Sequence, residues 1–416
     1  MKIWLINAYG NLPNEGWSEY RTTLMSKALS DAGHNVIWWV SNFEHRSKKF
    51  RSSDWKDIEI DNNFTIRIVP STAYYKHISI ARIRYEIKFC KNILNKAIEL
   101  NDFPDFVIVG EPALFTNHII KKLVSTLKSQ LIIDIIDLWP ELFRILLPKF
   151  LVKYDKIIFS PLYLSRKLFL KKADAIVAVT NDYLDIGKKE AKAKYYETIY
   201  LGFNSSKLKK DYPIELTNSI LKNYKIEPKS NIDFFVIYAG TLSNNYDINS
   251  ILLTSLKLKV NNNINIKIII AGDGPYKDSI IDFIQKNNLN NLFYIGRIEN
   301  ETLEYIYSVC DLALCTYVKD SSVSIPMKFY DYISSGLPVL CSLNREIGQL
   351  ITKYNIGRFY ISENHIDMYK QIISLSSNPS LINSMKKNSI NLSSSFTYEK
   401  QYYKIVDLIE KMVIKK

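Results

Sequence analysis

The chain has 416 residues, of which 47% are hydrophobic and 23% charged, and its formal net charge is +13. This composition excludes a globally disordered chain, because enough apolar side chains are present to bury a core. The length predicts two, or at most three, globular domains.

The sequence indicates neither a secretory signal nor a transmembrane helix. The opening apolar run, MKIWLINAYG, is too short for a signal peptide. The most apolar region, QLIIDIIDLWPELFRILL, is interrupted by charges, whereas a span needs about 20 mostly apolar residues. The four cysteines and five histidines lack metal-site spacing. We therefore expect buried thiols in a reducing cytoplasm, and neither a metal nor another cofactor.

The first half of the chain predicts a parallel sheet covered by helices on both faces. Short, continuously apolar runs alternate with segments of helical length, which is the pattern of buried parallel strands. The predicted strands are KIWLIN (2–7), NVIWWV (35–40), FTIRIV (64–69), DFVIV (105–109), LIIDII (131–136), AIVAV (175–179) and ETIYL (197–201).

The segment from Arg144 to Lys172 is both basic and apolar, and it contains a single acid. Lysines beside exposed apolar side chains favour adsorption to an anionic membrane surface. Two other interpretations stay open: an ordinary helical pair packed on the first domain, and a gene composition that makes the whole surface basic. Nucleic acid is a weaker candidate partner and is not expected, because no nucleic-acid-binding motif is present.

A polar, turn-rich break at residues 202–213 separates the two halves. The same alternation then resumes, with strands predicted at FFVIYAG (234–240), NIKIIIAG (265–272), LFYIG (292–296), LALCTY (312–317) and LPVLC (337–341). We therefore predict an α/β protein with two doubly wound parallel-sheet domains.

The loops that follow strands are where ligands bind in such folds. Three of them in the second half carry glycines: Gly240-Thr241, the IAGDGP loop with Gly274, and Gly296-Arg297-Ile298. Glycines let backbone amides approach a ligand, and the following helix N-terminus favours an anion. The backbone at Arg297 and Ile298 is a candidate reader of a base edge. Plain turns and a solvated arginine are the alternatives.

The stretch SVSIPMKFYDYISSGLPVLCS, residues 322–342, predicts a short helix followed by a buried strand. Ser324 is the expected N-cap, Pro326 lies near the helix start, and Gly336 is the expected left-handed terminator. Lys328 and Asp331 are three residues apart and should share a helix face. A carboxylate there matches the two hydroxyls of a ribose, and the lysine suits phosphate. A surface ion pair is the alternative.

The order of these motifs resembles the nucleotide-sugar-binding half of retaining glycosyltransferases of family four. In the first half, EGWSEYRTTLMSKALSDAGHNV is similar to the first loop and helix of that family. The motif IIDLWPEL is similar to the D-L-W-P-E signature of members that transfer amino sugars in bacterial O-antigen and capsule synthesis. The resemblance implies the GT-B fold, with two Rossmann-like domains facing across a cleft.

The implied domains are 1–204 with the C-terminal helix 398–416, for the acceptor, and 205–397, for the nucleotide sugar. The resemblance implies transfer with retention of a hexose or N-acetylamino sugar, from a donor that is UDP-linked in its amino-sugar relatives, without a metal. Asp137 is the candidate catalytic residue, and capping of the turn after it is the alternative. The donor candidates are Gly16, Gly240, Thr241, Gly274, Arg297, Ile298, Ser324, Lys328 and Asp331. The acceptor candidates are Arg21, Glu111, Trp139 and Glu141.

The expected acceptor is a polyprenol-linked saccharide on the inner face of the bacterial cytoplasmic membrane, reached through Arg144–Lys172. Two departures from the family bear on the donor. The first of its usual pair of glutamates falls on Val323, and its usual diphosphate clamp is missing, which leaves Lys328, Arg297 or Arg21 as substitutes. A non-catalytic scaffold with this fold, or a sugar-nucleotide epimerase, therefore stays an alternative.

Overall fold

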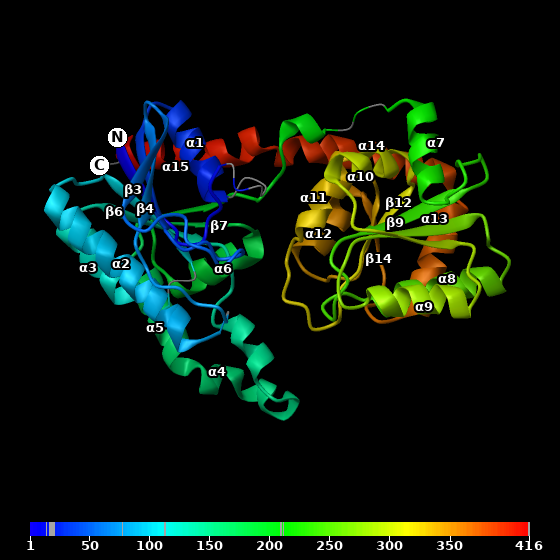
Figure 1. Ribbon diagram of the computed structural model, residues 1–416, viewed down its shortest axis with the longest axis horizontal. Helices are drawn as coiled ribbons and strands as arrows, with labels where there is room; N and C mark the ends of the chain where they lie inside the picture. Colours follow the sequence, from blue (N-terminus) through cyan, green and yellow to red (C-terminus); the bar gives the residue numbers. More distant parts are fainter. Residues whose placement is uncertain are drawn as a thin grey trace. The chain divides into compact units, whose positions relative to one another are not determined.

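The computed structural model describes residues 1–13, 15, 21–76, 78–111, 114–208, 210 and 212–414, with the side chains of residues 111 and 145 left aside. The chain forms two compact units: unit 1 is Met1–Leu201 with Glu399–Lys416, and unit 2 is Gly202–Tyr398. Figure 1 shows the helices and strands of both.

Unit 1 is built on an eight-stranded sheet with the order β3-β4-β2-β1-β5-β6-β7-β8. Every pairing is parallel except β3 with β4. The strands are β1 (Lys2–Ile6), β2 (Asn35–Ser41), β3 (Lys56–Asp61), β4 (Phe64–Val69), β5 (Phe106–Glu111), β6 (Gln130–Ile135), β7 (Ala175–Ala178) and β8 (Tyr195–Thr198). The strand order reverses between β1 and β5, which makes their carboxyl ends the expected ligand position.

Helices cover both faces of this sheet. Figure 1 shows α2, α3 and α5 side by side on one face, where their apolar side chains form a core with the strands. The helices are α1 (Arg21–Asp31), α2 (Ile80–Leu100), α3 (Asn117–Leu127), α4 (Asp155–Ile158), α5 (Ser160–Leu170), α6 (Asn181–Glu190) and α15 (Tyr398–Ile414), with the 3-10 helices η1 (Glu141–Leu146) and η2 (Lys149–Tyr154).

Unit 2 has a six-stranded, all-parallel sheet with the order β11-β10-β9-β12-β13-β14. Its strands are β9 (Phe234–Ala239), β10 (Ile266–Ala271), β11 (Leu292–Gly296), β12 (Leu312–Cys315), β13 (Val339–Cys341) and β14 (Gly357–Phe359). The strand order reverses between β9 and β12. The helices are α7 (Ile214–Asn223), α8 (Ile248–Val260), α9 (Lys277–Lys286), α10 (Asn300–Val309), α11 (Met327–Ser334), α12 (Glu346–Tyr354), α13 (His365–Ser376) and α14 (Pro379–Ser393), with the 3-10 helices η3 (Ser205–Lys207) and η4 (Ser394–Phe396).

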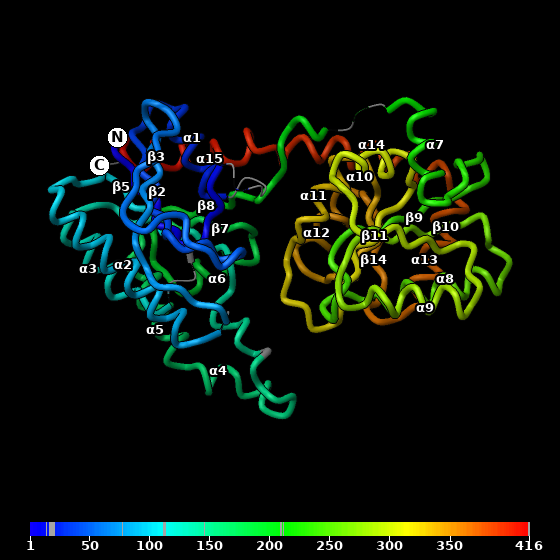
Figure 2. Tube along the Cα trace, in the orientation of Figure 1, coloured from blue at the N-terminus to red at the C-terminus, as the bar shows by residue number. Residues whose placement is uncertain are grey.

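The predicted fold class is confirmed: both sheets are doubly wound, as in the GT-B fold. The last helix, α15, returns to unit 1, where Figure 2 shows the end of the chain beside its start. There Tyr402 of α15 lies under the guanidinium of Arg21 in α1, with 5.8 Å between Cζ and the ring centroid. The hydroxyl of Tyr402 also donates to the carbonyl of Leu201.

The helix of the 322–342 stretch is α11, and one of its predicted caps is wrong. Its N-cap is Pro326, with no side-chain hydrogen bond, and Ser324 is a buried residue ahead of it whose carbonyl accepts from the amide of Ile347. Gly336 does have the expected left-handed backbone, with φ of 74°. All four cysteines are free and buried. No helix in the described ranges is long and apolar enough to cross a membrane.

Candidate functional site

The carboxyl ends of β9, β10 and β11 surround an open pocket of about 310 Å³. Four of the predicted donor residues meet here: Gly240, Thr241, Arg297 and Ile298. The side chains of Thr241 and Arg297 are exposed. The full lining is Ala239, Gly240, Thr241, Ala271, Gly272, Asp273, Arg297, Ile298 and Leu303. The pocket therefore lies where a doubly wound sheet binds its ligand.

Glycines make this pocket possible by letting two loops pack backbone to backbone. Gly272 has a φ of 149°, and a Cβ on it would lie 1.9 Å from the carbonyl oxygen of Gly240. Gly274, a predicted donor residue, has a φ of 152°, and its Cβ would lie 2.4 Å from the carbonyl oxygen of Leu242. Gly274 is outside the pocket lining, so its observed contacts are with the neighbouring loop.

Lys328 lies at the point where the strand order of unit 2 reverses. Its Nζ would be 2.9 Å from a Cβ placed on Gly240. Three tyrosine rings surround this ammonium group, with centroids 4.0 Å (Tyr238), 4.3 Å (Tyr246) and 5.5 Å (Tyr317) from Nζ. The Nζ atom is buried and has no hydrogen-bond partner among the described residues. Burial lowers the pKa of Lys328 to about 8.

A buried ammonium without a counter-charge is costly, so a structure that keeps one usually reserves it for an anionic ligand. The tyrosine faces offset part of the cost through cation–π attraction. Lys328 is not paired with Asp331, so the surface ion pair between them is excluded. The carboxylate of Asp331 instead lies 3.4 Å from Nζ of Lys207, and both side chains stay partly exposed, at 40% and 36%. Burial raises the pKa of Asp331, and the charge of Lys207 lowers it.

In unit 1, Asp137 lies two residues beyond the end of β6, and its side chain is exposed. Throughout the described residues its carboxylate makes no hydrogen bond or ion pair, so the alternative of a turn-capping carboxylate finds no support. Although the side chain reaches solvent, the protein packed around it partly desolvates the carboxylate and raises the pKa of Asp137, and the charge of Arg82 lowers it. The guanidinium of Arg82 lies over the ring of the half-buried Trp139, 4.7 Å from its centroid.

The other acceptor candidates are placed differently. Arg21 is buried, and its guanidinium donates to both oxygens of Asp134, at 2.8 and 2.9 Å. This pair lies in the interior of unit 1, where Arg21 supports the fold. A direct contact of Arg21 with an acceptor or a diphosphate stays a prediction. Glu141 is paired with Arg166, 2.6 Å away, and Arg166 also binds the carbonyl of Trp139. The Glu141–Arg166 pair therefore holds the loop that carries Trp139.

Two candidates cannot be placed. Gly16 lies outside the described residues. Glu111 ends β5, but its side chain is not among those described.

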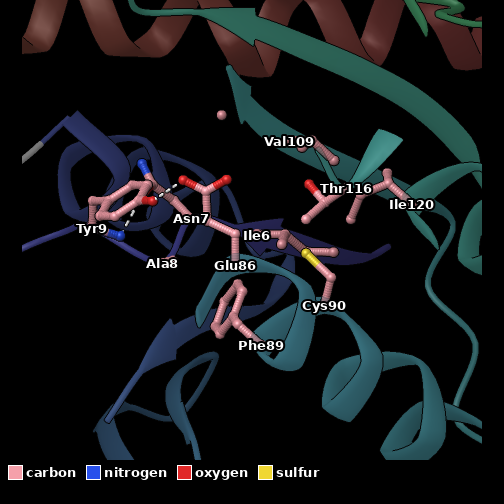
Figure 3. Close-up of a pocket in the computed structure, with 11 residues that line it drawn as sticks. Ile6, Asn7, Ala8, Tyr9, Glu86, Phe89, Cys90, Val109, Thr116 and Ile120 are labelled. Carbon is pink, nitrogen blue, oxygen red and sulfur yellow. Dashed lines mark hydrogen bonds between the residues drawn. The ribbon is translucent and has the colours of Figure 1, made fainter. Parts of the chain in front are cut away.

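Sequence reasoning missed a polar cluster where the strand order of unit 1 reverses. A pocket there is lined by residues after β1 and at the end of β5, and by one side of α2 (Figure 3). The hydroxyl of Tyr9 donates to the carboxylate of Glu86, and Nε of Arg82 donates to both, at 3.1 and 3.2 Å. Burial raises the pKa of Glu86. The only signal in the sequence is that Glu86 shares a helix face with Phe89 and Ile93, which is a rare position for an acid.

Comparisons with known proteins agree with this architecture. Residues 221–392 match the family described as glycosyl transferases group 1. Four curated relatives carry the name chitobiosyldiphosphodolichol beta-mannosyltransferase. That of Debaryomyces hansenii is 32% identical over 21% of this chain and 19% of its own length, and that of Kluyveromyces lactis is 22% identical over 81% and 78%. The alignments with the first three curated relatives span less than half of those proteins.

Solved structures share the whole fold at low identity. Sucrose-phosphate synthase from Thermosynechococcus elongatus is 15% identical over 100% of both chains, with a TM-score of 0.71. Anabaena Alr3699/HepE, solved with UDP, is 11% identical over 99% of this chain and 100% of its own, with a TM-score of 0.69. These likenesses show the fold. Residues 221–392 thus match the group 1 glycosyltransferases, on a chain whose two parallel α/β sheets are those of the GT-B fold.

Proposed function

We propose that this protein transfers a hexose or N-acetylamino sugar from a nucleotide sugar, bound by unit 2, to a lipid-linked saccharide bound by unit 1. The observation that carries the proposal is the buried, unpartnered ammonium of Lys328 beside Gly240, in the region that matches the group 1 family. A diphosphate supplies the negative charge that this group lacks. Stabilising the leaving diphosphate is the main electrostatic task in such a transfer.

The remaining donor residues fit the same ligand. Ile298 and Arg297 line the pocket. A backbone amide suits the edge of the base, and a guanidinium suits a phosphate. Asp331 suits the vicinal hydroxyls of the ribose, with Lys207 fixing its carboxylate. UDP is the nucleotide we propose, because a structural relative was solved with UDP. Retention at the anomeric carbon stays a prediction that rests on the family resemblance.

The acceptor we propose is a saccharide on a polyisoprenoid carrier in bacterial surface-polysaccharide synthesis. The names of two kinds of relative support this acceptor. The curated relatives are named for a diphosphodolichol-linked saccharide. The structural relative WaaG, with 12% identity and a TM-score of 0.63, is described as a glycosyltransferase of lipopolysaccharide biosynthesis. Asp137 would orient the acceptor hydroxyl or the transferred sugar, and Trp139 would stack on a sugar face.

A transfer assay tests this function. The purified protein is incubated with UDP- and GDP-linked sugars and a short-chain, diphosphate-linked saccharide. A saccharide lengthened by one sugar is the expected product, and comparison of anomeric configurations in donor and product by NMR decides retention. Nucleotide binding without transfer to any acceptor would favour the non-catalytic scaffold. An isomerised donor sugar would favour the epimerase.

We also propose that the segment Arg144–Lys172 contacts an anionic membrane. Large apolar side chains are exposed along it, among them Phe150 (71%) and Ile157 (73%). Its one acid, Asp155, is buried and paired with Arg144, so the exposed charges of the segment are cationic. Figure 1 shows this segment, around α4, extending from α5. Apolar side chains flanked by lysines suit insertion between anionic headgroups.

The membrane proposal predicts that Phe150→Asp with Ile157→Asp lowers binding to phosphatidylglycerol vesicles at least tenfold in a sedimentation assay. Each substitution removes an inserted apolar side chain and adds a repelled charge. A matched control is Ile232→Asp, an equally exposed isoleucine (77%) of unit 2, which should bind like the unaltered protein. Equal binding by the double variant and the control would count against the proposal, and so would equal binding to phosphatidylcholine.

A further inference from the structure

A second ammonium group without a hydrogen-bond partner among the described residues lies in unit 1, on the loop that follows β2. The loop from Glu44 to Lys49 is closed by backbone hydrogen bonds between its ends and by the carboxylate of Glu44, which accepts from the amides of Arg46 and Ser47. Lys48, the penultimate residue of this loop, has a φ of 57°, which is a left-handed conformation that is uncommon for a residue other than glycine. Backbone strain of this kind persists where the surrounding structure holds it, often at ligand sites.

The ammonium of Lys48 is directed inward. Its Nζ lies 4.4 Å from the centroid of the Tyr74 ring, is buried, and has no hydrogen-bond partner within the described ranges. Burial lowers the pKa of Lys48, the positive charge of Arg82 lowers it further, and the negative charge of Glu44 raises it. The closest acid in the loop, Glu44, already satisfies backbone amides. Glu44 thus attracts Lys48 without forming a hydrogen bond to its ammonium group, and Nζ has no hydrogen-bond partner among the described residues.

Arg82 brings a second cation to the same wall of aromatic side chains. Its guanidinium lies between the rings of Tyr9 and Trp139, with centroids 4.9 and 4.7 Å from Cζ. His45 bridges the two parts, because its ring packs 5.3 Å from that of Tyr9 and 5.8 Å from that of Tyr74. One acid, Glu86, is paired with Arg82. Among the described residues, Glu86 is the acid that forms an ion pair with one of these two cations, and Lys48 forms none.

We propose that Lys48 and Arg82 form a subsite for the phosphate or diphosphate that links the acceptor saccharide to its carrier. This inference rests on the proposed function and makes it more specific, because it assigns the residues of unit 1 that bind the phosphate of the acceptor. The site lies at the carboxyl ends of β1, β2 and β4. Arg82 also lies over the ring of Trp139, two residues beyond Asp137, and its charge acts on Asp137. In the proposed subsite, the saccharide of the acceptor therefore points toward Asp137 and its phosphate toward Lys48.

The test compares two acceptors that differ only in the phosphate: one saccharide as a short alkyl diphosphate, and the same saccharide as a plain alkyl glycoside. In Lys48→Met we expect the KM for the diphosphate acceptor to rise about tenfold or more, because a charge-assisted hydrogen bond is lost. The KM values for the plain glycoside and for the donor should stay unchanged. Lys49→Met, which removes the neighbouring exposed lysine, should behave as the unaltered protein.

A rise in KM for both acceptors alike, or for neither, would overturn the subsite. A rise in the KM for the donor would show that Lys48 binds the donor diphosphate instead.

A binding measurement tests the subsite independently of the transfer activity. A short alkyl diphosphate is titrated calorimetrically into the unaltered protein, Lys48→Met and Lys49→Met. Weaker binding in Lys48→Met alone supports the subsite even if no transfer is found. Equal binding in all three refutes it even if transfer occurs.

Discussion

In the transfer assay, Asp137→Asn is expected to lower kcat by at least about 100-fold, while the affinity for the nucleotide stays unchanged. A positioned carboxylate that accepts or orients a proton contributes about 100- to 10,000-fold. Asparagine keeps the shape and removes the negative charge. The reason to assign this role to Asp137 is its exposed carboxylate, which no described side chain or amide engages, at the carboxyl end of β6.

The transfer activity of Asp137→Asn should also differ from that of the unaltered protein in its pH dependence. Partial desolvation by the surrounding protein raises the pKa of Asp137, so the carboxylate form is lost at a higher pH than for an ordinary aspartate. Transfer by the unaltered protein should therefore decline on the acid side, and the residual activity of Asp137→Asn should not follow that limb. An unchanged kcat in Asp137→Asn would remove Asp137 from the mechanism and leave Glu111 as the next candidate.

Arg21→Met is expected to lower the free energy of unfolding by about 3–5 kcal/mol, because it leaves the buried carboxylate of Asp134 without its partner. The side chains of the pair are 1% and 5% exposed. The substitution also removes the donor to the carbonyl of Ile199. Urea denaturation followed by circular dichroism measures the loss, as a shift of the midpoint for unit 1.

The double variant Arg21→Met with Asp134→Leu is the control for Arg21→Met. Replacing both members of a buried pair with apolar side chains is often nearly neutral, so most of the lost stability should return. If Arg21 instead bound the acceptor and contributed little to folding, the single variant would unfold like the unaltered protein and lose activity only. The same midpoint in the single and double variants would show that the pair is not the cause.

The main strands could be read from the sequence because buried parallel strands are continuous apolar runs. Two edge strands were not predicted. The strand β3, KDIEID, alternates apolar and charged residues and pairs antiparallel at the sheet edge, and β14 is only three residues long. Neither strand contains a continuous apolar run, and a search for such runs, which identifies buried parallel strands, therefore does not find them.

The residues of the candidate site that directly follow a strand could be predicted from the sequence. The topology brings Gly240, Arg297 and Ile298 to one pocket, and the sequence shows each after a strand. Contacts between distant residues were not predictable. The tyrosine cage of Lys328 combines positions 238, 246 and 317, and Arg21 meets an aspartate 113 residues away. The Ser324 cap failed because the helix begins later, after Pro326.

The central claim is that unit 2 binds a nucleoside diphosphate through Lys328 and Asp331. The measurement that tests it most directly is calorimetric titration of UDP and of GDP into the protein, alongside Lys328→Met and Asp331→Ala. We expect one nucleotide to bind, UDP by our proposal, and each substitution to weaken its binding about 10- to 150-fold, which corresponds to the loss of one charged hydrogen bond.

Burial lowers the pKa of Lys328 to about 8, so the affinity for the nucleotide should also fall about tenfold between pH 7 and pH 9, and Lys328→Met should not show this fall. Binding that survives both substitutions, or no binding of either nucleotide to the folded protein, would contradict the account.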